Sequence, residues 1–294
     1  MLRPGEYLFP SASKGHIHLR DPGLDDRFVI DMGVAERVRI EPAEEEDSEE
    51  LARISKRAFE TDVDVGAPNL GGPPGYDSPE FQSWAMGVME YHNIRLDDEL
   101  VGGIIADTRG GDHGVMERVF VEPERHRMGI GGRAVGLLLG LHPEVRIWTL
   151  GTPEWNVRTK EFYEGLGFVQ VGWELGDEAW RGRWYQRLMG DEPYEFRLIG
   201  GLRDGMSGVT VEGEVLEKGD ARSVRSKRRR WETLTVANVG FGDASGRVVL
   251  VLWNEQIRKV KVGDRLRIEN GYVSSYLGVT QLNVGRSGRL ITLI

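Results

Sequence analysis

The chain has 294 residues, 39% of them hydrophobic and 29% charged, which is typical of a globular protein. One hydrophobic core usually serves fewer residues than this, so the length favours two domains. The chain has no cysteine, which excludes disulfides, thiolate zinc sites and cysteine nucleophiles and predicts a cytoplasmic protein. No apolar run approaches the roughly 20 residues that a membrane helix needs, and the six histidines lack metal-site spacing, so we expect no membrane and no metal binding.

The net charge of −9 is distributed unevenly along the chain. Residues 195–294 contain 17 basic and 11 acidic side chains, whereas residues 1–194 contain 21 basic and 36 acidic side chains. A local excess of positive charge favours contact with nucleic acid, and a negative total disfavours it. The asymmetry therefore predicts a basic module carried by an acidic one.

Residues 1–33 show no sustained strand or helix period and lack the apolar core of a secretory signal. A second methionine, Met32, stands just before the first predicted strand. The segment is either an extension from an upstream start site or a functional arm, and the sequence leaves both open.

Residues 34–190 carry alternating strand and helix patterns. A strand pattern at residues 37–40 is followed by the acidic run 44–47, which suits the positive end of a helix dipole. Asp47 and Glu50 have the spacing of a capping box, so a helix is expected to begin here. The patterns that follow predict helices from Ser78 and over 130–141 and 156–165, and strands at 91–96, 100–107, 115–121, 146–152, 168–175 and 182–189.

A glycine-rich loop, residues 121–133, joins the strand at 115–121 to the helix that follows. Gly129, Gly131 and Gly132 allow a ligand to approach the backbone and turn several N–H groups toward it. The start of the helix adds a partial positive charge, so the loop suits a pyrophosphate. Glycines at a strand–helix junction also occur where only a tight turn is needed, and the loop by itself leaves this open.

This loop resembles motif A of the GNAT N-acetyltransferase superfamily, Gln/Arg-x-x-Gly-x-Gly/Ala. Asn156 with residues 162–168, Phe-Tyr-Glu-Gly-Leu-Gly-Phe, resembles motif B of that superfamily, and residues 71–78 and 148–156 resemble one branch of it. His126 stands at the usual Gln/Arg position of motif A. Because such loops hold phosphate mainly through the backbone, we expect a lower affinity for CoA and no loss of the site.

The resemblance covers residues 34–190 and implies an α+β GNAT domain, a mixed sheet with flanking helices. Two parallel strands of the sheet would splay apart and hold the pantetheine arm of acetyl-CoA, the expected acetyl donor. Amine acetylation needs a base that keeps the amine neutral, backbone N–H groups that polarise the thioester, and an acid for the departing thiolate. The implied contacts with acetyl-CoA are Val119, Val121, Arg127, Met128, Gly129, Ile130, Gly131, Gly132 and Asn156.

Two side chains are candidates for proton transfer. Tyr163 matches the usual acid of the superfamily, although a tyrosine on an amphipathic helix can also be a packed aromatic. Glu117 is the candidate base because it lies on the core strand that precedes the loop, although a carboxylate there can also be solvated. Asn156 is expected to hydrogen-bond the pantetheine arm or its thiol end.

Residues 190–194, Gly-Asp-Glu-Pro-Tyr, form the expected linker, and residues 195–294 carry only strand patterns. The predicted strands are residues 208–216, 231–239, 247–253, 264–272 and 279–282. Five short strands separated by glycine-rich turns predict an all-β, five-stranded barrel.

Five segments of this barrel form a further pattern: Leu252-Trp253, Val262–Asp264, Ile268–Tyr272, Tyr276–Gly278 and Gln281–Gly285. Together they resemble the OB fold of archaeal single-stranded DNA-binding proteins and of replication protein A, which also suggests an archaeal source. The resemblance implies an OB-fold nucleic-acid-binding domain in which Trp253, Tyr272 and Tyr276 stack on bases. Each stacked base contributes roughly 1–3 kcal/mol in such sites.

The residues themselves are consistent with this implication. Tyr272 and Tyr276 are expected to flank a short turn and to share a face with Trp253. A basic loop at residues 222–230 is expected to join the first two barrel strands and to make binding strongly salt-dependent. Its expected phosphate contacts are Arg225, Lys227, Arg228, Arg229 and Arg230. The alternative is that Trp253 belongs to the core and that the loop is merely solvated.

Three functions are compatible with this sequence. The favoured one is an acetyltransferase whose OB fold places it on single-stranded DNA or RNA. Its acceptor would be an amine on a small molecule, on nucleic acid, or on a protein such as one associated with nucleic acid. The second is a nucleic-acid-binding protein whose GNAT domain binds CoA without catalysis. In the third, the OB fold binds a protein partner and no nucleic acid.

Overall fold

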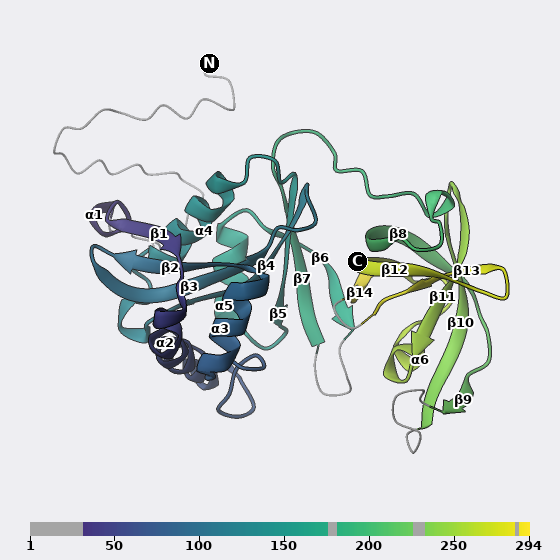
Figure 1. Ribbon diagram of the computed structural model, residues 1–294, viewed down its shortest axis with the longest axis horizontal. Helices are drawn as coiled ribbons and strands as arrows, with labels where there is room; N and C mark the ends of the chain where they lie inside the picture. Colours follow the sequence, from purple (N-terminus) through teal and green to yellow (C-terminus); the bar gives the residue numbers. More distant parts are fainter. Residues whose placement is uncertain (1–31, 176–180, 226–232, 286–287) are drawn as a thin grey trace.

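Two bodies of secondary structure lie side by side and share one sheet (Figure 1). The computed structural model describes residues 32–175, 181–225, 233–285 and 288–294. The first body runs from residue 32 to residue 188, and the second, a barrel, runs from residue 207 to residue 293. Residues 1–31 of the expected N-terminal extension lie outside the described residues.

The first body is a mixed sheet with helices on both faces, which confirms the predicted fold class. Its strands, in spatial order, are β1 (Val38–Pro42), β2 (Glu90–Leu96), β3 (Glu99–Asp107), β4 (His113–Val121), β5 (Ile147–Pro153), β7 (Arg181–Leu188) and β6 (Val169–Leu175). Its α-helices are α1 (Met32–Ala35), α2 (Ser48–Glu60), α3 (Pro79–Val88), α4 (Ile130–Leu141) and α5 (Val157–Gly165). Short 3₁₀ helices are η1 (Glu45–Asp47), η2 (Thr61–Val65), η3 (Pro123–Arg125) and η4 (Ile199–Gly201), the last of which precedes the barrel.

The two faces of this sheet have separate apolar cores because successive strand side chains alternate. Ile105 of β3 packs in the core beneath α2 and α3, whereas its neighbour Ile104 packs in the core beneath α4. The start of α3 follows from its sequence: the Ser78 hydroxyl oxygen accepts a hydrogen bond from the Phe81 N–H at 3.1 Å, and Pro79 occupies the first helical position. Among the described residues, no helix is both long and apolar enough to cross a membrane.

The strands β4 and β5 are parallel and paired only near their beginnings. Residues 113–115 pair with residues 147–149, and the described ladder between the two strands ends with Val115 opposite Thr149. We call this point the fork. The expectation of two parallel strands that splay apart is therefore confirmed, and β4 continues for six residues past the fork before the loop that leads into α4.

The second body is a closed five-stranded barrel, as predicted. Its strands are β8 (Ser207–Lys218), β10 (Thr233–Asp243), β11 (Gly246–Trp253), β13 (Val279–Asn283) and β12 (Arg265–Tyr276), with β12 pairing back to β8. The short elements β9 (Arg222–Arg225), α6 (Glu255–Lys259) and β14 (Arg289–Leu293) were not expected. Val211, Phe241, Leu250 and Leu282 are fully buried in its core, which is separate from the two cores of the first body.

The strand β14 joins the two bodies, because it pairs with β12 of the barrel and also with β6 of the first body. A Cβ atom placed at Gly172 of β6 would lie 2.3 Å from the Thr292 carbonyl oxygen. Glycine at this position therefore permits β14 to approach β6 and to continue the sheet into the barrel (Figure 1). The residues of the expected linker also make contacts: the Tyr194 hydroxyl donates to Asp112 Oδ1 at 3.0 Å.

Candidate functional site

The glycine-rich loop has the backbone geometry of an anion site. The strand β4 ends at Val121, and Gly129, with a φ of 80°, precedes the first residue of α4, Ile130. Arg127 also has a positive φ, 62°. The N–H groups of the first turn of any helix have no acceptor within the helix, and they lie at its positive end. The loop therefore presents the donors and the charge that a pyrophosphate requires.

His126, which departs from the resembled motif, holds this loop in place. Its Nε2 lies 2.8 Å from the Val121 carbonyl oxygen, and because a carbonyl only accepts, Nε2 carries the proton and donates. Burial lowers the pKa of the His126 imidazole, so the ring is neutral near pH 7. Its contribution is to tie the loop to the end of β4.

Gly131 and Gly132 lie in the first turn of α4, opposite Phe162 and Leu166. A Cβ atom at Gly131 would lie 3.4 Å from Phe162 Cζ and 3.8 Å from Val121 Cγ2. A Cβ atom at Gly132 would lie 3.5 Å from Leu166 Cδ2. These are ordinary van der Waals distances, so packing against Phe162 and Leu166 leaves room for a Cβ atom and does not by itself explain the glycines.

Tyr163 projects from α5 into the core, and its side chain is 7% exposed. Its ring contacts Phe162 and Phe168 edge-on, with centroid distances of 4.9 and 5.7 Å. Burial raises the pKa of the Tyr163 hydroxyl, so the group is protonated at neutral pH. Tyr163 is therefore a packed aromatic, and the assignment as an acid stays a prediction with which its protonation is consistent.

Asn156 caps the amino-terminal end of α5. Its side-chain oxygen accepts a hydrogen bond from the Thr159 N–H at 3.1 Å, and the residue is buried. Asparagine is among the residues most favoured at this position, because it satisfies one free N–H of the first turn. The expected contact between Asn156 and pantetheine stays a prediction.

Glu117 lies on β4, two residues past the fork, at a β-bulge. Its neighbours Met116 and Arg118 pair with β3, whereas Glu117 is the extra residue between them. Both of its carboxylate oxygens accept from the guanidinium Nη2 of Arg289, on β14, at 2.7 and 2.8 Å. The candidate base is therefore engaged in an ion pair with the barrel, a contact that the sequence does not reveal because 172 residues separate the partners.

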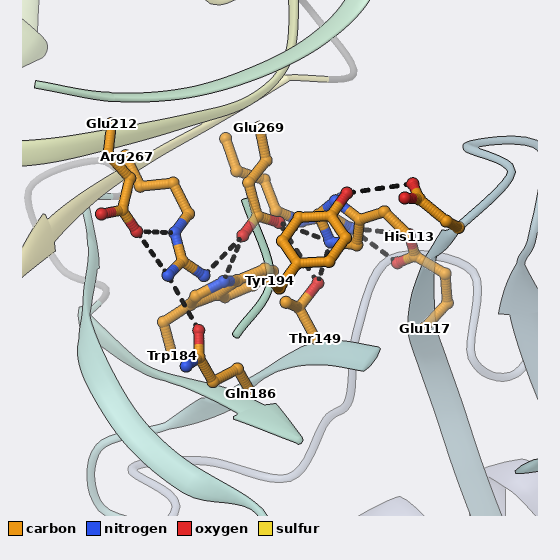
Figure 2. Close-up of polar contacts among 11 residues, drawn as sticks. His113, Glu117, Thr149, Trp184, Gln186, Tyr194, Glu212, Arg267 and Glu269 are labelled. Carbon is orange, nitrogen blue, oxygen red and sulfur yellow. Dashed lines mark hydrogen bonds and ion pairs between the residues drawn. The ribbon is translucent and has the colours of Figure 1, made fainter. Parts of the chain in front are cut away.

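A second group of polar contacts joins the barrel to the same face of the sheet (Figure 2). Glu269 of β12, with a side chain 2% exposed, accepts a hydrogen bond from Trp184 Nε1 at 2.9 Å and one from the Thr149 hydroxyl at 3.3 Å. The His113 Nε2 lies 2.9 Å from the same hydroxyl oxygen and 3.8 Å from the Glu269 carboxylate. The buried carboxylate of the barrel is thus satisfied by groups of the first body.

Arg267, two residues before Glu269 on the same strand, completes this group. Its guanidinium donates to Glu212 of the barrel at 2.6 and 2.9 Å and to Gln186 of β7 at 2.8 Å, and it lies 3.4 Å from Glu269. It also stacks over the Phe196 ring, 4.3 Å from the centroid. Arg267 and Glu269 of the barrel therefore form polar contacts with neighbouring residues of the first body.

The three aromatic residues predicted to stack on bases share the outer face of the barrel. The side chains of Leu250 and Leu252 fill the core, so the side chain of Trp253 points outward. Asn283 of β13 pairs with Val251 on one side and with Tyr272 on the other, which puts Tyr272 on that same face. Tyr276, four residues further along β12, also lies there. Trp253, Tyr272 and Tyr276 are 38%, 44% and 59% exposed, so the alternative of a core tryptophan is not supported.

Two details of the predicted nucleic-acid surface are wrong. Tyr272 and Tyr276 do not flank a turn, because β12 continues to Tyr276 through its pairing with β13, and the turn follows at Leu277 and Gly278. Residues 222–225 are not loop, because they form β9, which pairs with β10 and ends at the exposed Arg225. The remaining expected phosphate contacts, Lys227, Arg228, Arg229 and Arg230, lie outside the described residues.

Two protein-family models match separate segments of the chain. Residues 56–168 match the acetyltransferase (GNAT) family, and residues 202–292 match the single-stranded DNA binding protein Ssb-like OB fold. The single-stranded DNA binding protein Ssb of Saccharolobus solfataricus is 33% identical over 92 residues, which are 31% of this chain and 60% of that protein. The protein YrkN of Bacillus subtilis is 26% identical over 129 residues, which are 43% of this chain and 70% of that protein.

Solved structures also align with this chain. An acetyltransferase from Thermus thermophilus has 16% identity and a TM-score of 0.41, over 52% of this chain and 97% of that chain. The PaiA N-acetyltransferase from Thermoplasma acidophilum, solved in complex with coenzyme A, has 15% identity and a TM-score of 0.44, over 52% of this chain and 99% of that chain. The chain spans less than two thirds of the length of Ssb. The two family models thus place a segment similar to the acetyltransferase (GNAT) family, residues 56–168, and a segment similar to the Ssb-like OB fold, residues 202–292, within one chain.

Proposed function

We propose that this protein transfers the acetyl group of acetyl-CoA to an amine at the fork between β4 and β5. The observation that carries the proposal is the separation of these strands, together with a loop after β4 that has free backbone donors at a helix start. The pyrophosphate would bind the loop at residues 127–132, and the pantetheine arm would lie along β4, near Val119 and Val121.

In the proposed reaction the amine nitrogen attacks the thioester carbonyl carbon. A base takes a proton from the amine, the new C–N bond forms, and the C–S bond breaks. The CoA thiolate leaves with the sulfur electron pair and takes a proton from the Tyr163 hydroxyl. The base thus gains one proton and the acid loses one, and the products are the amide and the free CoA thiol.

Release of free thiol from acetyl-CoA tests this proposal. The full chain is incubated with acetyl-CoA and, in separate reactions, with a peptide bearing a free N-terminal alanine, a lysine peptide blocked at its terminus, and spermidine. Thiol release that depends on one of these amines supports acetyl transfer. Binding of acetyl-CoA in calorimetry without thiol release from any amine favours the second function, a CoA-binding domain without catalysis.

Replacing Gly131 with valine should weaken acetyl-CoA binding by about tenfold, the equivalent of about one hydrogen bond to a charged group. The branched side chain would crowd the loop, because even a Cβ atom at Gly131 lies 3.4 Å from Phe162. Gly136→Val is the matched control, since it changes the same helix at an exposed position where a Cβ atom meets nothing within 4 Å. If calorimetry gave equal affinities of Gly131→Val and the parent for acetyl-CoA, the proposed binding of acetyl-CoA at this loop would be wrong.

We further propose that the OB fold binds single-stranded DNA or RNA through Trp253, Tyr272 and Tyr276. The support is the exposure of three aromatic rings on one face of β11 and β12, the two strands that flank β13, together with the Ssb-like family match. Stacking on these rings needs bases with free faces, which a duplex hides, so we expect the full chain to prefer single strands.

Trp253→Ala should weaken binding of poly(dT) by roughly 1–3 kcal/mol and leave the salt dependence of binding nearly unchanged. Neutralising Arg228, Arg229 and Arg230 should instead flatten the slope of log affinity against log salt, by roughly 0.7 per phosphate contact. Trp84→Ala, which removes a tryptophan 54% exposed on α3, is the control and should leave poly(dT) binding intact. A preference for duplex, or no effect of Trp253→Ala on a folded protein, would favour a protein partner for the OB fold.

A further inference from the structure

The sheet face that lies toward the barrel carries, near the fork, the carboxyl group of Glu174, a residue that belongs to neither motif A nor motif B. Val115 and Thr149 are the last paired residues of β4 and β5. Glu117 and Gly151 each lie two residues past that pair, one on each strand, where the strands begin to separate. Glu117 contacts Arg289 of the barrel, and Gly151 lies two residues past Thr149, which contacts Glu269 of the barrel, so both positions lie on the face toward the barrel.

The Trp184 ring fills the place that a side chain at Gly151 would occupy, and the carboxyl group of Glu174, on β6, lies beside it. A Cβ atom at Gly151 would lie 3.2 Å from Glu174 Oε2 and 2.7 Å from Trp184 Cζ3. Glycine at this position therefore leaves room for the Trp184 ring and for the Glu174 carboxyl beside it. As a result, the fork has a carboxyl group on each side, Glu117 from β4 itself and Glu174 over β5.

The two carboxyl groups differ in their partners. Glu117 accepts two hydrogen bonds from Arg289, whereas Glu174 has no hydrogen bond or ion pair within the described ranges. The charged groups that face Glu174 are Arg289 on β14, Glu269 on β12 and Glu117 on β4. Burial raises the pKa of the Glu174 carboxyl to about 7; Arg289 opposes this rise, and Glu269 and Glu117 add to it.

We propose that Glu174, and not Glu117, is the general base of the acetyl transfer at the fork, with Arg289 of the barrel as its positioning residue. The inference rests on the proposed function. The Glu174 carboxylate takes one proton from the acceptor ammonium, and the neutral amine forms its bond to the acetyl carbon. The C–S bond breaks as the departing thiolate takes the Tyr163 proton, and the second proton on the nitrogen goes to the Tyr163 phenolate, which leaves the amide and the free CoA thiol. Arg289 forms an ion pair with Glu117, and its positive charge limits the rise in the pKa of Glu174. The barrel therefore contributes a residue to the acetyltransferase site.

Glu174→Gln in the full chain tests the assignment with whichever amine of the panel supports turnover. We expect kcat to fall at least about 100-fold, a typical loss for a general base, with an unchanged Kd for acetyl-CoA in calorimetry. Glu174→Asp should restore part of the rate. Glu99→Gln makes the same chemical change on an exposed carboxylate and should leave kcat unchanged. Parent-like kcat in Glu174→Gln, with loss of turnover in Glu117→Gln, would return the role to Glu117 and overturn the proposal.

The pH profile adds a readout that a structural role would not move. A base acts when deprotonated, so kcat/KM of the parent should rise with pH through about 7. This rising limb of the pH profile should be absent in Glu174→Gln. Arg289→Gln should shift the limb to higher pH, because removing a nearby cation raises a carboxyl pKa, and Arg289→Lys should restore it. A limb that is unmoved in both Glu174→Gln and Arg289→Gln contradicts the proposal.

A titration that needs no turnover separates this inference from the proposed function. Carboxyl ¹³C resonances of the parent, with Glu174 assigned from its loss in Glu174→Gln, should show a midpoint near 7. A midpoint near the ordinary 4.5 overturns the role of Glu174 even if acetyl transfer is observed. Absence of thiol release from the parent with every amine, seen before any variant is made, counts against the proposed function itself.

Discussion

Removing the Tyr163 hydroxyl should lower turnover about tenfold or more and leave the affinity for acetyl-CoA nearly unchanged. Tyr163→Phe keeps the ring that packs against Phe162 and Phe168, so the core of α5 is preserved. Only the protonated hydroxyl is lost, and without it the CoA thiolate must leave without a proton donor. Steady-state thiol release gives kcat, and calorimetry with acetyl-CoA gives the binding constant.

Tyr185→Phe is the matched control for this variant. Tyr185 is a fully buried tyrosine of the same core whose hydroxyl donates to Glu164 Oε1 at 3.5 Å, so Tyr185→Phe removes a hydroxyl that the proposed reaction does not use. A fall in kcat that is specific to Tyr163→Phe supports the acid. Equal kcat values in Tyr163→Phe and the parent would leave Tyr163 a packed aromatic only.

Arg267→Ala should destabilise the protein by about 3–5 kcal/mol, the usual cost of removing one partner of a buried ion pair. The side chains of Arg267 and Glu269 are 3% and 2% exposed, so the Glu269 carboxylate would lose the arginine paired with it while remaining buried. The Gln186 and Glu212 acceptors would also lose their donor. Urea unfolding followed by tryptophan fluorescence measures the change, since Trp184 itself bonds Glu269.

Arg265→Ala is the control on the same strand. Arg265 lies 3.9 Å from the same Glu212, but its side chain is 67% exposed, so its removal should cost less than about 1 kcal/mol. A similar small loss for both variants would mean that the interface group adds no stability beyond that of a surface pair. Separate transitions for the two bodies in the Arg267→Ala protein would show that the pair also couples them.

Much of the local structure of both bodies follows from the sequence. The predicted limits of strands and helices agree with the observed ones to within a few residues where the hydrophobic period, a capping residue or a glycine turn marks them, as Ser78 and Pro79 do at the start of α3. The same is true of the loop before α4, where Gly129 adopts the positive φ that its residue type permits. The outward side chain of Trp253 also follows from alternation along β11.

The errors arise where pairing between distant segments decides the outcome. The strand β12 continues past Tyr272 because β13 pairs with it as far as Tyr276, and no local signal ends or extends a strand in that way. The five-residue strand β14 has too little pattern to be recognised alone, and it is ordered by β12 on one side and β6 on the other. Gly172 is a signal for that contact only once the approach of Thr292 is known.

The two fold classes, the glycine-rich turn before α4 and the outward aromatic residues of the barrel follow from the sequence, because each depends on residues close together in the chain. The tertiary structure alone decided how the two bodies meet and which charges face each other there. Glu117 is paired with Arg289, Glu269 is buried against Trp184, and Glu174 is left unpaired among the described residues beside Gly151. The physical reason is that burial and electrostatic environment, which set the pKa of a carboxyl group, depend on neighbours brought together by folding and not on neighbours in sequence.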